Sequence, residues 1–318
     1  MKRLFPLGPV LAAVLAGLAA TSVQAQSSVT AYGRLNVTVE RQKAGNTTNT
    51  VLQNNSSRIG FKGTEDMGGG LKAGFQLEHG FSADTGVAAA TFWGRQSEVN
   101  LSGGFGMLRL GRFTSEAYYA TADYISMHNH DTGTSSDAFY AYLGRDQNKV
   151  SYRLPALGPV TLEIGTSLNE GVVENGRRLK NTIDVAANYQ AGPLHLGAGY
   201  QKNDQQNQFA IRALYEIGAF TLGAYVQRDE DAYGAGKRTT SRLAGMYALG
   251  QSEFHLNFGH AGNYSDEPGN TSANQFTAGY NYNLSKRTKV YGFYTKVDDK
   301  GTIYGDFSSL AVGLRHNF

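Results

Sequence analysis

Hydrophobic and polar residues alternate along almost the whole chain after residue 28. In the final segment, 309–318, the even-numbered positions are mostly apolar up to Phe318, and the odd-numbered positions are small or polar. Residues two apart in a strand point to the same side, so this period of two predicts β-strand rather than helix. A strand with one apolar and one polar face that ends on an aromatic residue is typical of a barrel wall in lipid.

The same alternation recurs in sixteen segments, which we predict to be antiparallel strands. They span about 28–41, 52–65, 70–81, 92–102, 106–114, 147–155, 159–168, 181–190, 193–202, 208–216, 219–228, 238–248, 252–262, 273–284, 288–298 and 308–318. Short connections rich in Gly and Pro, such as 102–106 and 190–193, alternate with longer polar ones, such as 170–180 and 264–272. This layout predicts an all-β fold, one closed transmembrane antiparallel β-barrel, with both chain ends on the short-turn side.

A large secreted β-sandwich or solenoid is the soluble alternative, because its strands would alternate as well. A sandwich packs its apolar faces inward, however, and sixteen strands would normally be divided between domains. No linker interrupts the alternation. The barrel is therefore the favoured architecture.

The N-terminal residues predict an export signal. Lys2 and Arg3 precede an apolar stretch over 10–20, and Val23-Gln24-Ala25 follows at the position that a signal peptidase reads. The apolar stretch is shorter than the roughly 18–20 residues of a spanning helix, and no later stretch reaches that length. We predict a leader over 1–25 and a porin-like barrel over 26–318, with an uncleaved anchor as the alternative.

Composition and motifs narrow the possible functions. The chain has no Cys, and removal of Lys2 and Arg3 lowers its formal charge from +3 to +1, which argues against a nucleic-acid partner. His128 and His130 beside Asp131 provide too few ligands for a metal, and no phosphate-cradling or hydrolase motif is present. We predict no cofactor, no metal and no enzymatic activity, with an outer-membrane lipase-type enzyme as a minor alternative. Trp93 and the many tyrosines are expected in interfacial girdles and along the pore.

Four segments carry a specific resemblance to a known family. They are 28–33, 57–73 (Ser-Arg-Ile-Gly-Phe-Lys-Gly-Thr-Glu-Asp-Met-Gly-Gly-Gly-Leu-Lys-Ala), 94–112 and 313–318 (Gly-Leu-Arg-His-Asn-Phe). In these segments the chain resembles the general porins of Gram-negative β-proteobacteria, and the match runs in order from end to end. The resemblance implies a homotrimeric channel in outer-membrane lipid for small ions and hydrophilic solutes. It also implies recognition of the C-terminal strand, ending in Phe318, by the barrel-insertion machinery.

Basic residues on or near the polar face are candidates for a charged pore wall. They are Arg34, Arg58, Lys62, Lys72, Arg95, Arg109, Arg112, Lys149 and Arg153. The resemblance implies that Arg58 and Arg95 belong to an arginine ladder at the constriction, as in anion-preferring relatives. Many relatives carry a third basic residue where this chain has Ser151, which Lys149 and Arg153 flank in phase. We therefore expect weak anion preference or mixed selectivity.

The longest connection, Ser115 to Asp146, is rich in aromatic residues and acids. The resemblance implies that this loop folds inward and narrows the pore, and an outward flap on the cell surface is the alternative. The candidate acidic side, which would face Arg58 and Arg95, comprises Glu78, Glu116, Asp123, Asp131 and Asp137.

These features predict a passive diffusion porin that works by size exclusion and a charged constriction. One alternative is a substrate-specific channel for organic anions or sugars, which an aromatic track and saturable conductance would favour. The other is a non-conducting adhesive or structural barrel, whose lumen would have to be plugged.

Overall fold

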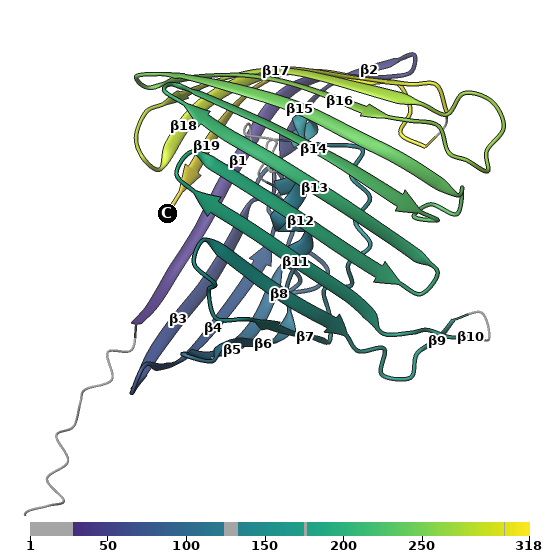
Figure 1. Ribbon diagram of the computed structural model, residues 1–318. Coiled ribbons are helices and arrows are strands. Elements are labelled where there is room, and N and C mark those ends of the chain that lie inside the picture. The colour runs from purple at the N-terminus through teal and green to yellow at the C-terminus, as the bar shows by residue number, and fades with distance from the viewer. Residues whose placement is uncertain (1–27, 124–132, 175–176, 302) are drawn as a thin grey trace, which may run out of the picture.

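The computed structural model describes residues 28–123, 133–174, 177–301 and 303–318, and one antiparallel sheet closes on itself as a barrel (Figure 1). Its strands are β1 (Ser28–Ala44), β2 (Thr47–Asn54), β3 (Arg58–Gly68), β4 (Leu71–Gly80), β5 (Gln96–Gly103), β6 (Gly106–Arg112), β7 (Lys149–Arg153), β8 (Val160–Ser167), β11 (Thr182–Ala191), β12 (Leu194–Asn203), β13 (Gln206–Ile217), β14 (Phe220–Glu230), β15 (Lys237–Leu249), β16 (Ser252–Ala261), β17 (Ala273–Asn283), β18 (Thr288–Asp299) and β19 (Phe307–Asn317). A separate hairpin, β9 (Val173–Glu174) and β10 (Arg177–Arg178), lies in the loop after β8.

The sheet has seventeen named strands but sixteen positions in the wall. Strands β2 and β3 pair with successive parts of β1 and together fill one position, so 17 − 1 = 16. Each other strand pairs with its neighbours along the chain, β8 pairs with β11, and β19 returns to β1. The predicted closed sixteen-stranded antiparallel barrel is confirmed.

The two faces of the wall have opposite polarity. On β19, Val312 is 69% exposed and points outward, whereas Ser309 is 1% exposed and points inward. The same alternation continues around the ring, with Leu, Ile, Val and Phe outside and Gln, Thr, Asn and charged residues inside. This is the pattern of a barrel whose outer face meets lipid and whose lumen is polar. No helix in the described ranges is long and apolar enough to cross a membrane.

A row of aromatic side chains crosses the outer face near the short-turn rim. Phe220, Tyr247, Phe254 and Tyr280 are register partners on β14 to β17, and their successive ring centroids are 4.6, 6.4 and 5.2 Å apart. Such a row is expected where a barrel wall passes from hydrocarbon to headgroups. Trp93, by contrast, precedes β5 in the loop after β4 and packs against Phe92.

The second wall strand differs from its predicted form. It begins at Thr47 and is interrupted at 55–57, because polar side chains replace part of the backbone ladder there. The Asn36 backbone N–H donates to Ser57 Oγ at 3.0 Å, and Asn36 Nδ2 donates to the Asn55 carbonyl at 3.1 Å. The predicted strand 92–102 likewise starts only at Gln96, after a long loop.

The barrel closes at a seam between β1 and β19. Gly33 and Phe318 exchange both backbone hydrogen bonds, each at 3.1 Å. The Phe318 ring covers Gly33 so closely that a Cβ atom there would lie 2.3 Å from Phe318 Cζ and 2.6 Å from the Arg58 carbonyl oxygen. Glycine at position 33 is therefore required by the close approach of the C-terminal ring.

Candidate functional site

The connection between β6 and β7 runs over residues 113–148. Its described parts, 113–123 and 133–148, turn into the barrel, and the helical part lies inside the ring of strands (Figure 1). It contains α2 (Glu116–Tyr118), the π-helical turn η1 (Tyr119–Asp123) and the 3₁₀ turn η2 (Gly133–Ser135). The Ser115 hydroxyl caps α2 by accepting from the Ala117 N–H at 3.2 Å. His128, His130 and Asp131 lie outside the described residues, as does the side chain of Asp123.

Three inward-pointing glutamines hold an extended part of this connection, which we call the inner segment (residues 136–143). The Oε1 atoms of Gln275, Gln227 and Gln201 accept from the N–H groups of Ala138, Ala141 and Leu143 at 3.2, 2.8 and 3.2 Å. Gln227 Nε2 and Gln275 Nε2 also donate to backbone carbonyls of the segment at 2.9 and 2.8 Å. The glutamines thus satisfy a backbone that has no strand partner.

A buried ion pair fixes the start of the inner segment. Arg242 Nη2 on β15 lies 2.6 Å from Asp137 Oδ1, and the two side chains are 0% and 1% exposed. The Tyr225 hydroxyl donates to the other carboxylate oxygen of Asp137. Gly259 leaves room for the guanidinium, because a Cβ atom there would lie 2.6 Å from Arg242 Nη2.

The helical part of the connection rests directly on β12. A Cβ atom on Gly197 would lie 1.8 Å from the Ala120 carbonyl oxygen, and one on Gly199 would lie 2.5 Å from that of Ala117. Only glycine permits this approach of two backbones. The helical turns and the inner segment are therefore both held against the wall.

A compact charge cluster occupies the inner face of β5 to β8. Arg109 binds Glu98 at 2.8 Å and Glu163 at 3.0 Å, and Arg153 binds Glu163 at 2.8 Å and Glu116 at 2.9 Å. Burial raises the pKa of the Glu116 carboxyl above its ordinary value. In this cluster three acids face two cations, so Arg109 and Arg153 add no net positive charge to the lumen.

The position where relatives were expected to carry a third basic residue belongs to the same cluster. Ser151 donates from Oγ to Glu163 at 2.8 Å and is the register partner of Arg109. Lys149 is buried and pairs with Asp184 at 2.9 Å. The two basic residues that flank Ser151 therefore have carboxylate partners of their own.

A second group of inward charges spans β1, β3, β4 and the end of the loop before β5, and its arginines outnumber its acids. Glu78 Oε1 lies 2.6 Å from Arg95 Nε and 3.7 Å from Arg58 Nε, and Glu78 Oε2 accepts from the Tyr32 hydroxyl at 2.9 Å. Arg34 is the register partner of Arg58. We call Arg34, Arg58, Arg95 and Glu78 the arginine wall. Glu78 lies within this wall, and not on a facing acidic side as expected from sequence.

The other basic residues predicted for the pore wall belong to neither of these two groups. Lys62 is exposed, with Nζ 5.3 Å from the centre of the Tyr32 ring. Lys72 is exposed beside the short turn before β4. Arg112 donates to the Gly94 carbonyl at 2.6 Å, which ties the end of β6 to the loop carrying Arg95.

The sequence did not point to two arginines whose side chains bind other side chains inside the barrel, Arg238 and Arg242. Arg238 Nη1 donates to the hydroxyls of Tyr264 and Tyr304, both at 2.8 Å. Both arginines share the even phase of the predicted strand 238–248, opposite the outward Leu243, and that phase is the signal that could have found them. The described ranges contain no group of three His, Cys, Asp or Glu side chains that could hold a metal ion.

Comparisons with known proteins agree with this architecture. A family model described as Gram-negative porin matches residues 11–302. The outer membrane porin protein 32 of Delftia acidovorans is 31% identical, over 96% of this chain and 98% of the relative. The major outer membrane protein P.IB of Neisseria meningitidis serogroup B is 29% identical, over 95% and 97%.

Solved structures give the same result. An anion-selective porin from Comamonas acidovorans superposes with a TM-score of 0.77 at 27% identity, over 92% of this chain and all of that one. Salmonella typhi OmpF, solved with daunomycin, has a TM-score of 0.74 at 17% identity, over 91% and 97%, and shares the fold. The chain belongs to the Gram-negative porin family. It is a passive diffusion channel of the outer membrane, and the predicted family, location and channel function are confirmed.

Proposed function

We propose that this porin favours anions weakly and that the arginine wall is the source of the preference. The arginine wall combines three arginines with one glutamate, and Arg95 is 35% exposed, so its charge can act on passing ions. Arginine stays charged at any working pH. The charge cluster on β5 to β8 has three acids and two cations, and Lys149 is paired with Asp184. Neither adds positive charge to the lumen, which keeps the preference weak. The structurally similar Comamonas acidovorans protein is described as anion-selective, which supports the proposal.

We further propose that the 113–148 connection forms the constriction. Its anchors to Gln201, Gln227, Gln275 and Arg242 hold it inside the barrel, where it occupies part of the cross-section. Solutes would then be sorted by size at this level and by charge at the arginine wall. Transport needs no chemical step and no cofactor.

A salt-gradient recording in a planar lipid bilayer tests this function. A tenfold KCl gradient should give an ohmic current whose reversal potential has the sign of anion preference, well short of the ~59 mV of ideal selectivity. A reversal potential of the cationic sign would contradict the proposal. A current that saturates with the concentration of one organic anion would favour a substrate-specific channel, and no conductance would favour an adhesive barrel.

We also propose that three copies assemble through the outer face of β1 to β5. This face carries the small residues Ala31 and Ala73 and a hollow of about 250 Å³ whose lining includes Val29, Phe75 and Val99. Small residues allow close packing between membrane proteins. Native mass spectrometry in mild detergent should give three times the chain mass, and a monomer with full channel activity would contradict the assembly. The C-terminal strand, through Phe318, would be the segment that the insertion machinery binds.

A further inference from the structure

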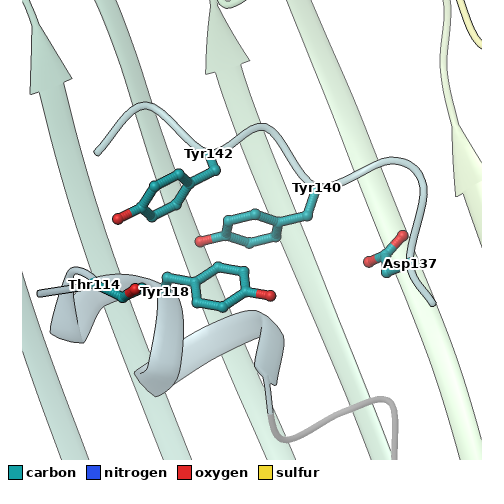
Figure 2. A pocket seen from close by; sticks show the side chains of 5 residues that line it. All are labelled: Thr114, Tyr118, Asp137, Tyr140 and Tyr142. Carbon is teal, nitrogen blue, oxygen red and sulfur yellow. The ribbon is translucent and has the colours of Figure 1, made fainter. Parts of the chain in front are cut away.

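A cavity of about 340 Å³ lies inside the barrel between the helical turns and the inner segment (Figure 2). Its lining is Thr114, Tyr118, Asp137, Tyr140 and Tyr142. Small-molecule sites have volumes of about 300–1,000 Å³, so this one has room for a single small ring and not for a chain of rings. We call it the tyrosine cavity.

The tyrosine rings meet edge to face and are not stacked on one another. The Tyr118 ring centre lies 5.6 Å from that of Tyr140 and 5.3 Å from that of Tyr142, and both interplanar angles are 74°. All three rings line the cavity, and Figure 2 shows the three side chains beside one another. An aromatic face attracts the slightly positive C–H groups of a ligand and repels anions.

The hydroxyl groups of two of these tyrosines are held by the protein itself. The Tyr140 hydroxyl bonds to Thr121 Oγ1 at 2.7 Å and accepts from Gln208 Nε2 at 3.2 Å. The Tyr142 hydroxyl donates to Asp146 and accepts from the Ser115 N–H at 3.1 Å. The rings are thus fixed before any solute arrives, which reduces the ordering cost of binding.

The cavity has little net charge. Asp137, its one ionised lining residue, is neutralised by Arg242 at 2.6 Å. The Thr114 hydroxyl also lines the cavity, and a hydroxyl can donate to or accept from a ligand. An anion would meet aromatic faces and a cation would find no unpaired carboxylate. A neutral ring with C–H faces and a rim of hydroxyls matches both the aromatic and the polar part of the lining.

We propose that the tyrosine cavity is a weak subsite for a neutral, hydroxylated ring of monosaccharide size. The proposal rests on the proposed function, because the 113–148 connection must border an open pathway for a solute to reach it. Binding must be weak, since a channel that retains its solute does not conduct it. The porin would remain a diffusion channel that passes sugars with a short residence at the loop.

Block of the ion current by D-glucose tests the subsite in the full-length channel in a planar bilayer. Glucose should lower the current saturably, and sorbitol, which has the same carbon number but no ring, should lower it only in proportion to viscosity. Replacing Tyr118 with Leu should raise the half-blocking concentration roughly tenfold, which corresponds to about 1.4 kcal/mol, because it removes an aromatic face from the lining of the cavity. Tyr118→Phe keeps the ring and should keep the block. Tyr294→Leu, on the outer face, is the matched control and should change nothing.

The outcomes separate the subsite from the proposed function. Equal effects of glucose and sorbitol in a normally conducting channel would overturn the subsite and leave the porin function intact. Loss of block in Tyr118→Phe, or block by benzyltrimethylammonium and not by glucose, would overturn the assignment to a neutral sugar ring. Absence of ion current in the unaltered protein would overturn both, because a closed lumen admits no sugar.

Discussion

Replacing Asp137 with Ala should release the inner segment from the wall and raise the single-channel conductance. The substitution leaves the Arg242 guanidinium fully buried without its carboxylate, and removal of one partner of a buried pair costs about 3–5 kcal/mol. The Tyr225 hydroxyl loses its acceptor as well. The strands of the barrel keep their backbone hydrogen bonds, so the barrel should stay folded while the loop detaches from the wall.

Single-channel recording at fixed salt measures this effect, with protease sensitivity of the loop as a second measure. Asp298→Ala is the control, because it removes an exposed partner of Lys300 at the loop rim and should leave the conductance unchanged. The double substitution Asp137→Leu with Arg242→Leu should recover part of the original conductance, since it leaves no buried charge. Unchanged conductance in Asp137→Ala would show that the pair does not hold the constriction.

Replacing both Arg58 and Arg95 with Ser should shift the reversal potential toward cations without closing the channel. The change removes two positive charges from the arginine wall and leaves Glu78 without an arginine partner. We expect a shift of roughly 10 mV in a tenfold KCl gradient, against the ~59 mV of full selectivity. The shift should shrink at high salt, because the Debye length falls from about 8 Å at physiological salt to about 3 Å at 1 M.

Two further variants control this result. Glu78→Gln should move the reversal potential in the opposite direction, toward anions, because it removes the acid of the arginine wall. Arg228→Ser alters an arginine on the outer face and should have no effect. If the double arginine variant kept its reversal potential at low salt, Arg58 and Arg95 would not set selectivity.

The wall of this protein could be predicted from its sequence because each strand carries its own signal. Alternation places Arg34, Arg58 and Arg109 on the lumen side without any knowledge of neighbouring strands. What alternation cannot supply is the partner of each charge. Glu163 neutralises Arg109 only because β8 lies next to β7 and β7 next to β6 in a particular register. Net charge at a point of the lumen therefore depends on pairing, which is a property of the whole ring.

The sequence indicated which connection is functional, the one over 113–148, but not which residues of the wall hold it. Its length and aromatic content marked it as functional, yet its anchors are far away in the sequence. Asp137 and Arg242 are 105 positions apart, and the glutamine that binds Ala138 is 137 positions away. The interruption at 55–57 was missed for a similar reason, because the Ser57 hydroxyl and the Asn55 backbone carbonyl accept hydrogen bonds from Asn36 on the adjacent strand.

The seam between β1 and β19 has a consequence for how the barrel is made. Glu40 and Ser309, which meet across it at 2.7 Å, are 269 positions apart, so the ring closes through one of the longest-range pairings that the chain allows. Bringing such distant segments together lowers the entropy of the chain before any contact between them contributes favourable free energy. Pairings of this kind therefore form slowly. Until β19 docks, β1 and β18 each present an open row of peptide groups, which hydrocarbon does not tolerate. A partly formed barrel therefore has no stable place in the bilayer, and insertion and completion of the ring must occur together.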